Sequence, residues 1–138
     1  MNHEEKAKDL FQSGYNCAQS VFAAEELGMD FETALKVSSS FGAGMGRLRE
    51  VCGTVSGMFM VVGLALGYST NANKDEKTEH YKRIQYLAAE FEKMNGSIIC
   101  RELLGLDHKK DSPTPSDRTT EYYKKRPCKE LVGDACKI

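Results

Sequence analysis

The sequence predicts an all-α fold, a single-domain helical bundle packed around one buried, glycine-rich helix. Its 138 residues are the length of one ordinary domain, taken as 1–138. Apolar residues such as Leu10, Phe11, Val21 and Phe22 recur at helical spacing, and no run alternates apolar and polar residues for long enough to predict a strand. Helices are predicted at residues 3–13, 16–27, 31–40, 48–67, 74–95, 97–104 and 127–137.

The helix predicted over 48–67 is the expected centre of the bundle. No charged residue occurs from Val51 to Tyr68, and several glycines recur there. A stretch of about 18 uncharged residues is the lower limit for a transmembrane helix. Its polar residues and the charged remainder of the chain favour a core helix instead, and glycine lets neighbouring helices approach closely. Polar linkers are predicted at 69–74 and 107–120.

Composition and charge indicate which binding partners and which cellular compartment to expect. The formal net charge is −1, from 19 basic and 20 acidic residues, which gives no reason to expect nucleic acid or an anionic membrane as a partner. The N-terminus lacks the apolar core of a secretory signal, so we expect a cytoplasmic protein. Cytosolic thiols are normally held reduced, and five cysteines are an odd number, so a disulfide framework is not expected.

The cysteines share a place in the predicted helices rather than a short spacing. No Cys-x-x-Cys pair occurs, which excludes the usual thioredoxin, zinc-ribbon and c-type haem signatures. A predicted capping box with Asn16 as the N-cap places Cys17 at the first position of its helix. Cys100 and Cys128 are likewise predicted in the first turn of a helix, and Cys52 lies near the start of the central one.

A cysteine at a helix N-terminus is placed to ionise. Free N–H groups and the positive end of the helix dipole stabilise a thiolate, the form that nucleophilic, redox and metal-ligating cysteines use. Packing explains each cysteine taken singly, because free cysteine is often buried, whereas the group taken together favours a function. Cys136 is set apart as a satellite thiol, because it is rotated about 80° from Cys128 and lies close to the end of the sequence.

A glycine-rich loop precedes the central helix and resembles a phosphate cradle. It follows a helical pattern, and Arg47 replaces the last glycine of the dinucleotide fingerprint, so a close backbone approach that admits Cys52 is the better interpretation. The three histidines lie far apart in the sequence and are expected on the surface. The candidate cofactor-binding positions are four glycines, Gly42, Gly44, Gly46 and Gly53.

Five short segments together form a recognisable set. They are GYNCA at 14–18, FGAGMG at 41–46, EVCGTVSG at 50–57, CRELLG at 100–105 and PC at 127–128. In this combination the chain resembles the C_GCAxxG_C_C family, described as redox-active proteins of anaerobic bacteria and archaea. The resemblance implies redox or metal chemistry at four spaced cysteines, often beside electron-transfer partners. A relative of the domain occurs in a haem-bearing cytochrome, but this sequence has no Cys-x-x-Cys-His, so covalent haem is not implied.

Three hypotheses of function follow. In the first, Cys17, Cys52, Cys100 and Cys128 converge on an iron–sulfur cluster, with zinc as the second choice, and the protein carries electrons to a protein partner. In the second, the protein is a thiol–disulfide oxidoreductase in which Cys17 attacks and Cys52 resolves, and these two lie close in space. In the third, it is a helical interaction module whose cysteines only pack. The oligomeric state is left open, a homodimer included.

Overall fold

The fold is helical throughout the part of the chain that the computed structural model describes, which is residues 2–24, 28–69 and 73–106 together with Ser112, Thr114, Cys128 and Leu131. In chain order the elements are α1 (His3–Gln12), α2 (Cys17–Ala24), α3 (Phe31–Ser38), the 3₁₀ turn η1 (Ser39–Phe41), α4 (Gly42–Met45), α5 (Gly53–Leu66), α6 (Lys74–Asn95) and α7 (Cys100–Leu103). Among these residues the β pairing is limited to one antiparallel bridge between Val51 and Ile99. The predicted all-α class is confirmed.

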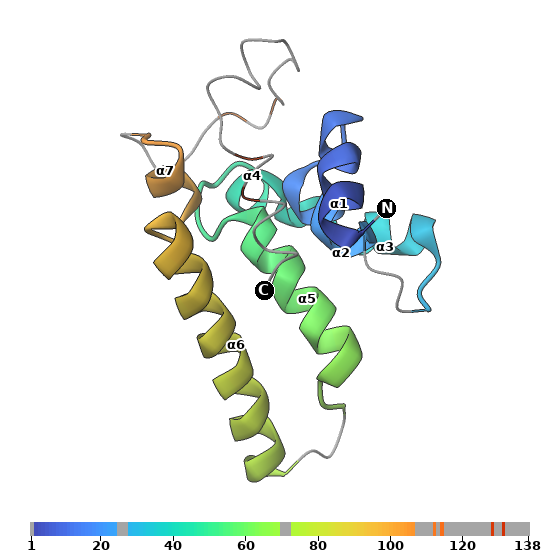
Figure 1. The fold of residues 1–138 in the computed structure, drawn as a ribbon, viewed down its shortest axis with the longest axis vertical. Helices are drawn as coiled ribbons and strands as arrows, with labels where there is room; N and C mark the ends of the chain where they lie inside the picture. Colours follow the sequence, from blue (N-terminus) through green and yellow to red (C-terminus); the bar gives the residue numbers. More distant parts are fainter. Residues whose placement is uncertain are drawn as a thin grey trace.

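The helices divide into a cluster and a hairpin. The helix α2 packs against α1, α3 and α5, while α5 and α6 lie side by side and project from the cluster as a long antiparallel pair (Figure 1). Phe91 of α6 is fully buried at the base of this pair. Within the part of the chain described, the base of the hairpin, where α5 begins beside α2, is therefore well enclosed.

Local hydrogen bonds explain where the helices begin and end. Asn2, Asp30 and Asn73 each precede a helix, and their side chains accept backbone N–H groups of its first turn. Gly96, in the left-handed conformation, ends α6. With a cap at each end, α6 spans the predicted range 74–95.

The predicted central helix is shorter and less enclosed than expected. It begins at Gly53 rather than at residue 48, because residues 50–52 pair with residues 98–100 instead. Its first six residues are buried, but Leu64 is 43% and Leu66 is 59% exposed. Among the described residues, the far end of α5 lies beside α6. None of the helices described is both long and apolar enough to cross a membrane.

Two helices are predicted after α6, over 97–104 and 127–137, and the structure describes only the first of these ranges in full. Instead of a helix over 97–104 the structure has only α7, because the Ser97 hydroxyl accepts the N–H of Ile99 at 3.0 Å and residue 99 is drawn into the bridge. The predicted helix 127–137 and the linker 107–120 lie mostly outside the described residues. Cys128 and Leu131 are both helical.

The glycine-rich loop forms a left-handed turn. Backbone φ is 57° at Ala43, 69° at Gly44 and 63° at Gly46, and the N–H of Gly46 donates to the carbonyl of Gly42 at 2.9 Å. Met45 and Arg47 share the conformation, with φ of 68° each. Left-handed geometry costs a non-glycine residue about 1–2 kcal/mol, so contacts around the turn have to hold it in place.

Candidate thiol site

Cys17 is fixed by the capping box that the sequence predicts. The Asn16 side-chain oxygen accepts the N–H of Gln19 at 2.8 Å, and the Gln19 side chain accepts the N–H of Asn16 at 3.0 Å. The amide of Asn16 also donates to the carbonyl of Ser39 at 3.0 Å, which ties the start of α2 to η1. Cys17 is thus the first residue of α2, and only 8% of it is exposed.

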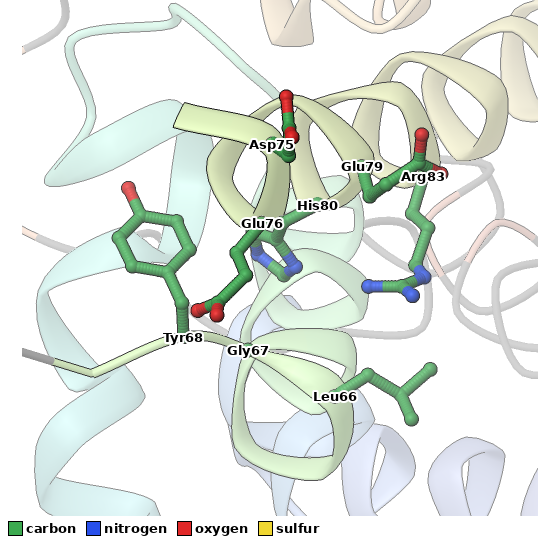
Figure 2. Close-up of a pocket in the computed structure, with 8 residues that line it drawn as sticks. All are labelled: Leu66, Gly67, Tyr68, Asp75, Glu76, Glu79, His80 and Arg83. Atoms are coloured by element: carbon green, nitrogen blue, oxygen red, sulfur yellow. The ribbon is translucent and has the colours of Figure 1, made fainter. Parts of the chain in front are cut away.

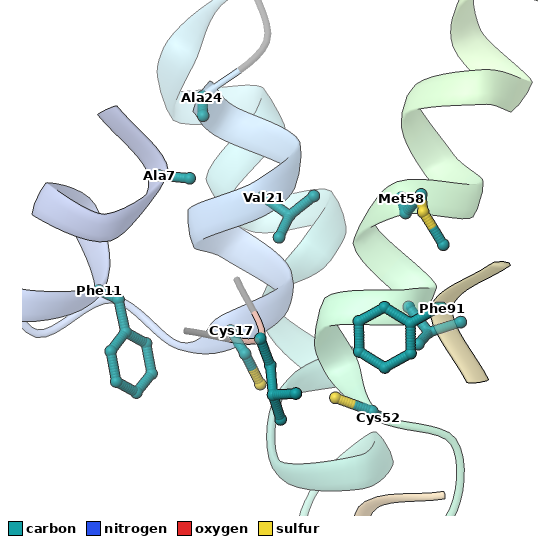
Figure 3. Close-up of a cluster of buried hydrophobic side chains, with 10 residues drawn as sticks. Ala7, Phe11, Cys17, Val21, Ala24, Cys52, Met58 and Phe91 are labelled. Atoms are coloured by element: carbon teal, nitrogen blue, oxygen red, sulfur yellow. The ribbon is translucent and has the colours of Figure 1, made fainter. Parts of the chain in front are cut away.

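Cys52 meets Cys17 from the opposite helix. It is the N-cap residue of α5, its N–H donates to the carbonyl of Ile98 at 2.7 Å, and it is 6% exposed. Both sulfur atoms point into the space between the N-terminal ends of α2 and α5 (Figure 3). Both residues belong to one buried cluster that also contains Leu131. The structure brings these two predicted site residues together.

Glycine makes this approach of α2 and α5 feasible. A Cβ atom at Gly53 would lie 2.7 Å from the Cys17 sulfur and 3.2 Å from the nitrogen of Ala18. One helical turn further on, a Cβ atom at Gly57 would lie 2.9 Å from Val21 Cβ. Protein atoms fill the space at both glycines, so α5 can begin directly against Cys17.

The electrostatic surroundings keep Cys52 protonated. Burial raises the pKa of the Cys52 thiol, the neighbouring Cys17 raises it further, and Cys128 adds a smaller effect in the same direction. The hydroxyl and N–H of Thr54 lower the pKa without reversing the shift. Cys52 is therefore a neutral thiol at neutral pH despite its place at a helix start. Cys128, which is half-buried, packs against the same cluster.

Cys100 has different neighbours, although it is also 6% exposed. It is the first residue of α7, and its N–H donates to the carbonyl of Glu50 at 2.6 Å, which places it diagonally across the bridge from Cys52. The Arg49 guanidinium, 1% exposed, lies with Nη1 3.5 Å from the Cys100 sulfur. A Cβ atom at Gly44 would lie 2.7 Å from Cys100 Cβ and from Arg49 Cα. A buried cation thus adjoins Cys100, whereas other thiols adjoin Cys52.

The described cysteines do not gather around one point. Cys17, Cys52, Cys100 and Cys128 are all free thiols, and Cys136 lies outside the described residues. Within the described part of the chain, no three His, Cys, Asp or Glu side chains lie close enough together to hold a metal ion. The metal-ligand set predicted from the sequence stays a prediction.

The loop glycines admit protein atoms rather than leaving a hollow. A Cβ atom at Gly42 would collide with the Asn16 side chain, and one at Gly44 would collide with the backbone of Arg49. Gly46 has more room, because the nearest neighbour of a Cβ atom there, the carbonyl oxygen of Ser40, would be 3.8 Å away. The loop closes on the starts of α2 and α7, and a role in cofactor binding stays a prediction.

Comparison with known families gives a match, and its description concerns redox activity. A model of the family described as "Putative redox-active protein (C_GCAxxG_C_C)" matches residues 15–138. The chain belongs to this family. The match contains all five cysteines. Comparison with curated proteins and with solved structures gave no match. The description of the C_GCAxxG_C_C family supports a redox-active protein, and the geometry above distinguishes the surroundings of the individual thiols.

This C_GCAxxG_C_C protein also has a pocket that sequence reasoning missed, at the far end of the hairpin from the cysteines. A hollow of about 400 Å³ lies between the end of α5 and the first turns of α6 (Figure 2). The rings of Tyr68 and His80 meet edge-to-face at 5.6 Å, and the hydroxyls of Tyr68 and Tyr81 are 2.7 Å apart. The sequence predicts His80 on an open surface. Its packing depends on Tyr68, at the end of α5, lying against the first turns of α6, which residue spacing does not encode.

Arg49 is the second feature that sequence reasoning missed. It stands next to Glu50, the last charged residue before the uncharged stretch from Val51 to Tyr68. A charged residue in that place is ordinarily expected to face water. Its burial depends on the left-handed turn and on α7, which comes much later in the sequence.

Proposed function

We propose that this protein is a thiol-based redox protein in which Cys17 and Cys52 interconvert between two thiols and a disulfide. The observation that carries the proposal is the meeting of these two cysteines, from separate helices, in one buried cluster at the base of the hairpin. Membership in a redox-active family supports it. The glycine at position 53 supports it too, since any larger residue would press on the Cys17 sulfur.

The chemistry is thiol–disulfide exchange with a disulfide-bearing protein partner. The Cys17 thiolate attacks one sulfur of the partner disulfide, forming a mixed disulfide and releasing the other partner sulfur as a thiolate. Cys52 then gives up its proton and attacks the Cys17 sulfur, which forms the Cys17–Cys52 disulfide and releases the second partner thiolate. The two electrons given up by Cys17 and Cys52 reduce the partner. The raised pKa of Cys52 suits the resolving role, because a protonated thiol does not compete for the first attack.

A partner is expected to meet the site from the side of Cys128. Cys17 and Cys52 are both buried, whereas Cys128 is half-buried and its thiol influences that of Cys52. A more accessible thiol beside a buried pair can pass a disulfide inward by the same exchange chemistry. We therefore place the partner, an electron-carrier or thiol protein, against the surface around Cys128.

The test is to identify which cysteines join on oxidation. The reduced protein is oxidised with diamide under anaerobic conditions and is then digested without reductant for mass spectrometry. Diamide takes up two electrons and two protons as two thiols form a disulfide. We expect a peptide pair linking Cys17 to Cys52. The Cys100→Ser variant should retain this link and Cys17→Ser should lose it. Recovery of a different pair as the main product would refute the proposal.

A thiophilic metal at the same cysteines is the second candidate. The observation in its favour is that Cys17 and Cys128 both influence the Cys52 thiol. The arrangement described does not fit a four-thiolate centre, because no three donors converge among the described residues and a guanidinium cation lies against Cys100. Iron and zinc analysis with visible absorption spectra of anaerobically purified protein tests this candidate. The metal site would be favoured over the dithiol if the protein binds one equivalent of cluster or zinc. Each of the single Cys→Ser variants at positions 17, 52, 100 and 128 would then have to lose it.

A further inference from the structure

The α5–α6 hairpin carries most of the large apolar side chains that reach the surface. Nine such side chains are exposed among the described residues, and six of them belong to this hairpin: Leu64, Leu66, Tyr68, Tyr81, Tyr86 and Met94. Leu66, at 59%, and Tyr86, at 63%, are the most exposed of the six. Single exposed apolar residues are ordinary on a soluble protein, whereas apolar residues gathered in one place mark a surface that binds something.

The two most exposed of these side chains, Leu66 and Tyr86, lie in one groove along a flank of the hairpin. The groove has a volume of about 340 Å³ and lies between the second half of α5 and the middle of α6. Its apolar lining comes from Val62 and Leu66 on α5 and from Tyr86 and Leu87 on α6. Val62 and Leu66 are one helical turn apart, so they present a continuous apolar stripe to the groove. This surface is called the hairpin groove below.

Charged residues of both signs border the hairpin groove. Glu79, Lys82 and Arg83 line it from α6, and Arg83 lies next to Leu66 of the opposite helix (Figure 2). The Lys82 ammonium is 3.3 Å from the Glu79 carboxylate, and the two side chains are 68% and 62% exposed. An ion pair as exposed as this contributes little to stability, so its members can exchange partners at small cost. The border thus offers both an acid and bases to whatever covers the apolar lining.

A second copy of this chain is the occupant that this border fits. In a twofold-symmetric dimer the same surface lies on both subunits, so each residue meets its counterpart's neighbour in a reciprocal way. A twofold axis at the level midway between Glu79 and Arg83 places Glu79 of each copy opposite Arg83 of the other. A partner of one strong charge would instead meet a like charge on this border. The formal net charge of −1 opposes the approach of two copies very little.

The size of the hairpin sets the strength to expect. The 22 residues of α6 make a helix about 33 Å long, and two helices side by side present a face about 20 Å wide. The footprint on each copy is then no more than about 650 Å², against roughly 800 Å² per partner in interfaces of standard size. Tyrosine and arginine, which the hairpin groove contains, often dominate the binding energy of an interface. A dimer that dissociates at micromolar concentration is therefore expected.

We propose that the hairpin groove is the interface between two copies of this chain, whose α5–α6 hairpins pack together as a four-helix bundle. Leu66 and Tyr86 are buried at the centre of this interface, and Arg83 of each copy pairs with Glu79 of the other. The inference goes beyond the dithiol proposal, because Cys17 and Cys52 lie at the base of the hairpin and their exchange requires no second copy. Each can fail without the other.

The experiment is sedimentation velocity of the full-length protein at concentrations from about 1 to 200 μM, the range in which an interface of this size associates. A phosphine reductant is present throughout, so that no intermolecular disulfide contributes. We expect the wild type to pass from monomer to dimer as its concentration rises. Tyr86→Glu should raise the dissociation constant at least about tenfold, because it places an unpaired charge at the buried centre of the interface.

Tyr81→Glu is the matched control. It makes the same substitution in the same helix at a tyrosine that is 52% exposed but does not line the hairpin groove. Its dissociation constant should equal that of the wild type. A wild-type protein that stays monomeric over the whole range would overturn the proposal and leave the groove to a different protein or to residues of this chain beyond 106. A dimer that Tyr86→Glu leaves intact, or that Tyr81→Glu weakens equally, would overturn it as well.

A charge exchange tests the pairing across the twofold axis. Arg83→Glu should weaken the dimer about tenfold, because it sets Glu79 of one copy against a like charge of the other. Adding Glu79→Arg to the same chain should restore association, and failure to restore it would contradict the pairing. Circular dichroism establishes that each variant folds, and should Tyr86→Glu not fold, the comparison of Arg83→Glu with the double variant decides. Cys17→Ser should leave the dimer intact, which keeps failure of this inference distinct from failure of the dithiol.

Discussion

Replacing Gly53 by alanine tests the contact between α2 and α5 at its tightest point. The added methyl carbon would lie 2.7 Å from the Cys17 sulfur and 2.7 Å from the carbonyl oxygen of Phe41. The second neighbour is backbone and cannot rotate away, so α5 has to shift. Overpacking of this kind costs about 1–3 kcal/mol. At the first position of a helix, alanine recovers only a small part of that cost. We expect Gly53→Ala to lower the free energy of unfolding by about 2 kcal/mol.

Gly63→Ala is the matched control, because it makes the same change in the same helix. No atom lies within 4 Å of a Cβ at Gly63, so alanine there should raise the free energy of unfolding by about 0.5–1 kcal/mol through helix propensity. Urea denaturation of the reduced proteins, followed by circular dichroism, measures both changes. A Gly53→Ala protein as stable as Gly63→Ala would refute the close approach of α5 to Cys17.

Three further changes probe the surroundings of the thiols. In the native state Cys52 holds its proton at pH values at which the unfolded thiol, with a pKa of about 8.5, has already lost it. The free energy of unfolding should therefore fall by up to roughly 1.4 kcal/mol per pH unit above about 8.5. Urea denaturation from pH 7 to 10 measures this slope, and Cys52→Ala should remove it. Asn16→Ala should cost about 1–2 kcal/mol in the same assay, more than Asn2→Ala at the exposed start of α1. Gly44→Ala, which combines φ of 69° with backbone collisions, should destabilise by more than about 2 kcal/mol, whereas Gly46→Ala should cost about 1 kcal/mol by melting temperature.

Each of these has an outcome that contradicts it. A pH slope that persists in Cys52→Ala would assign the titration to another group. Equal costs at the two asparagines would mean that the reciprocal bonds at the start of α2 add nothing to a single cap. Equal costs at the two glycines would mean that the left-handed turn can move away from α7 freely.

The helices were predictable because their signals are local. The stripe of apolar residues and the caps at Asn73 and Gly96 act within a few positions, and α6 matches its predicted range. The start of α5 was not predictable in this way. Residues 48–52 have a helical pattern, but pairing between Val51 and Ile99, almost fifty positions apart, withdraws them from the helix. A partner so distant leaves no trace in the spacing of apolar residues.

The candidate site, like the helices, was predictable only where its contacts lie between close neighbours in the sequence. The capping box fixed Cys17 correctly, since Asn16 and Gln19 are close neighbours in the chain. The pattern of helix starts also predicted that the cysteines near them are placed to ionise, and for Cys52 burial outweighs the helix start. The surroundings of Cys100 depend on Arg49, brought there by a turn whose left-handed geometry is carried partly by non-glycine residues. Residue type does not indicate such a turn.

The most direct test of the redox pair is an anaerobic equilibrium titration against mixtures of reduced and oxidised dithiothreitol. The fraction of free thiol at Cys17 and at Cys52 is read separately by alkylation and mass spectrometry. We expect the two thiols to disappear together in one two-electron transition, with a slope of about 30 mV per tenfold change in ratio. The transition should persist in Cys100→Ser and vanish in Cys17→Ser and Cys52→Ser. Independent loss of the two thiols, or full retention of both across the range, would contradict the Cys17–Cys52 disulfide.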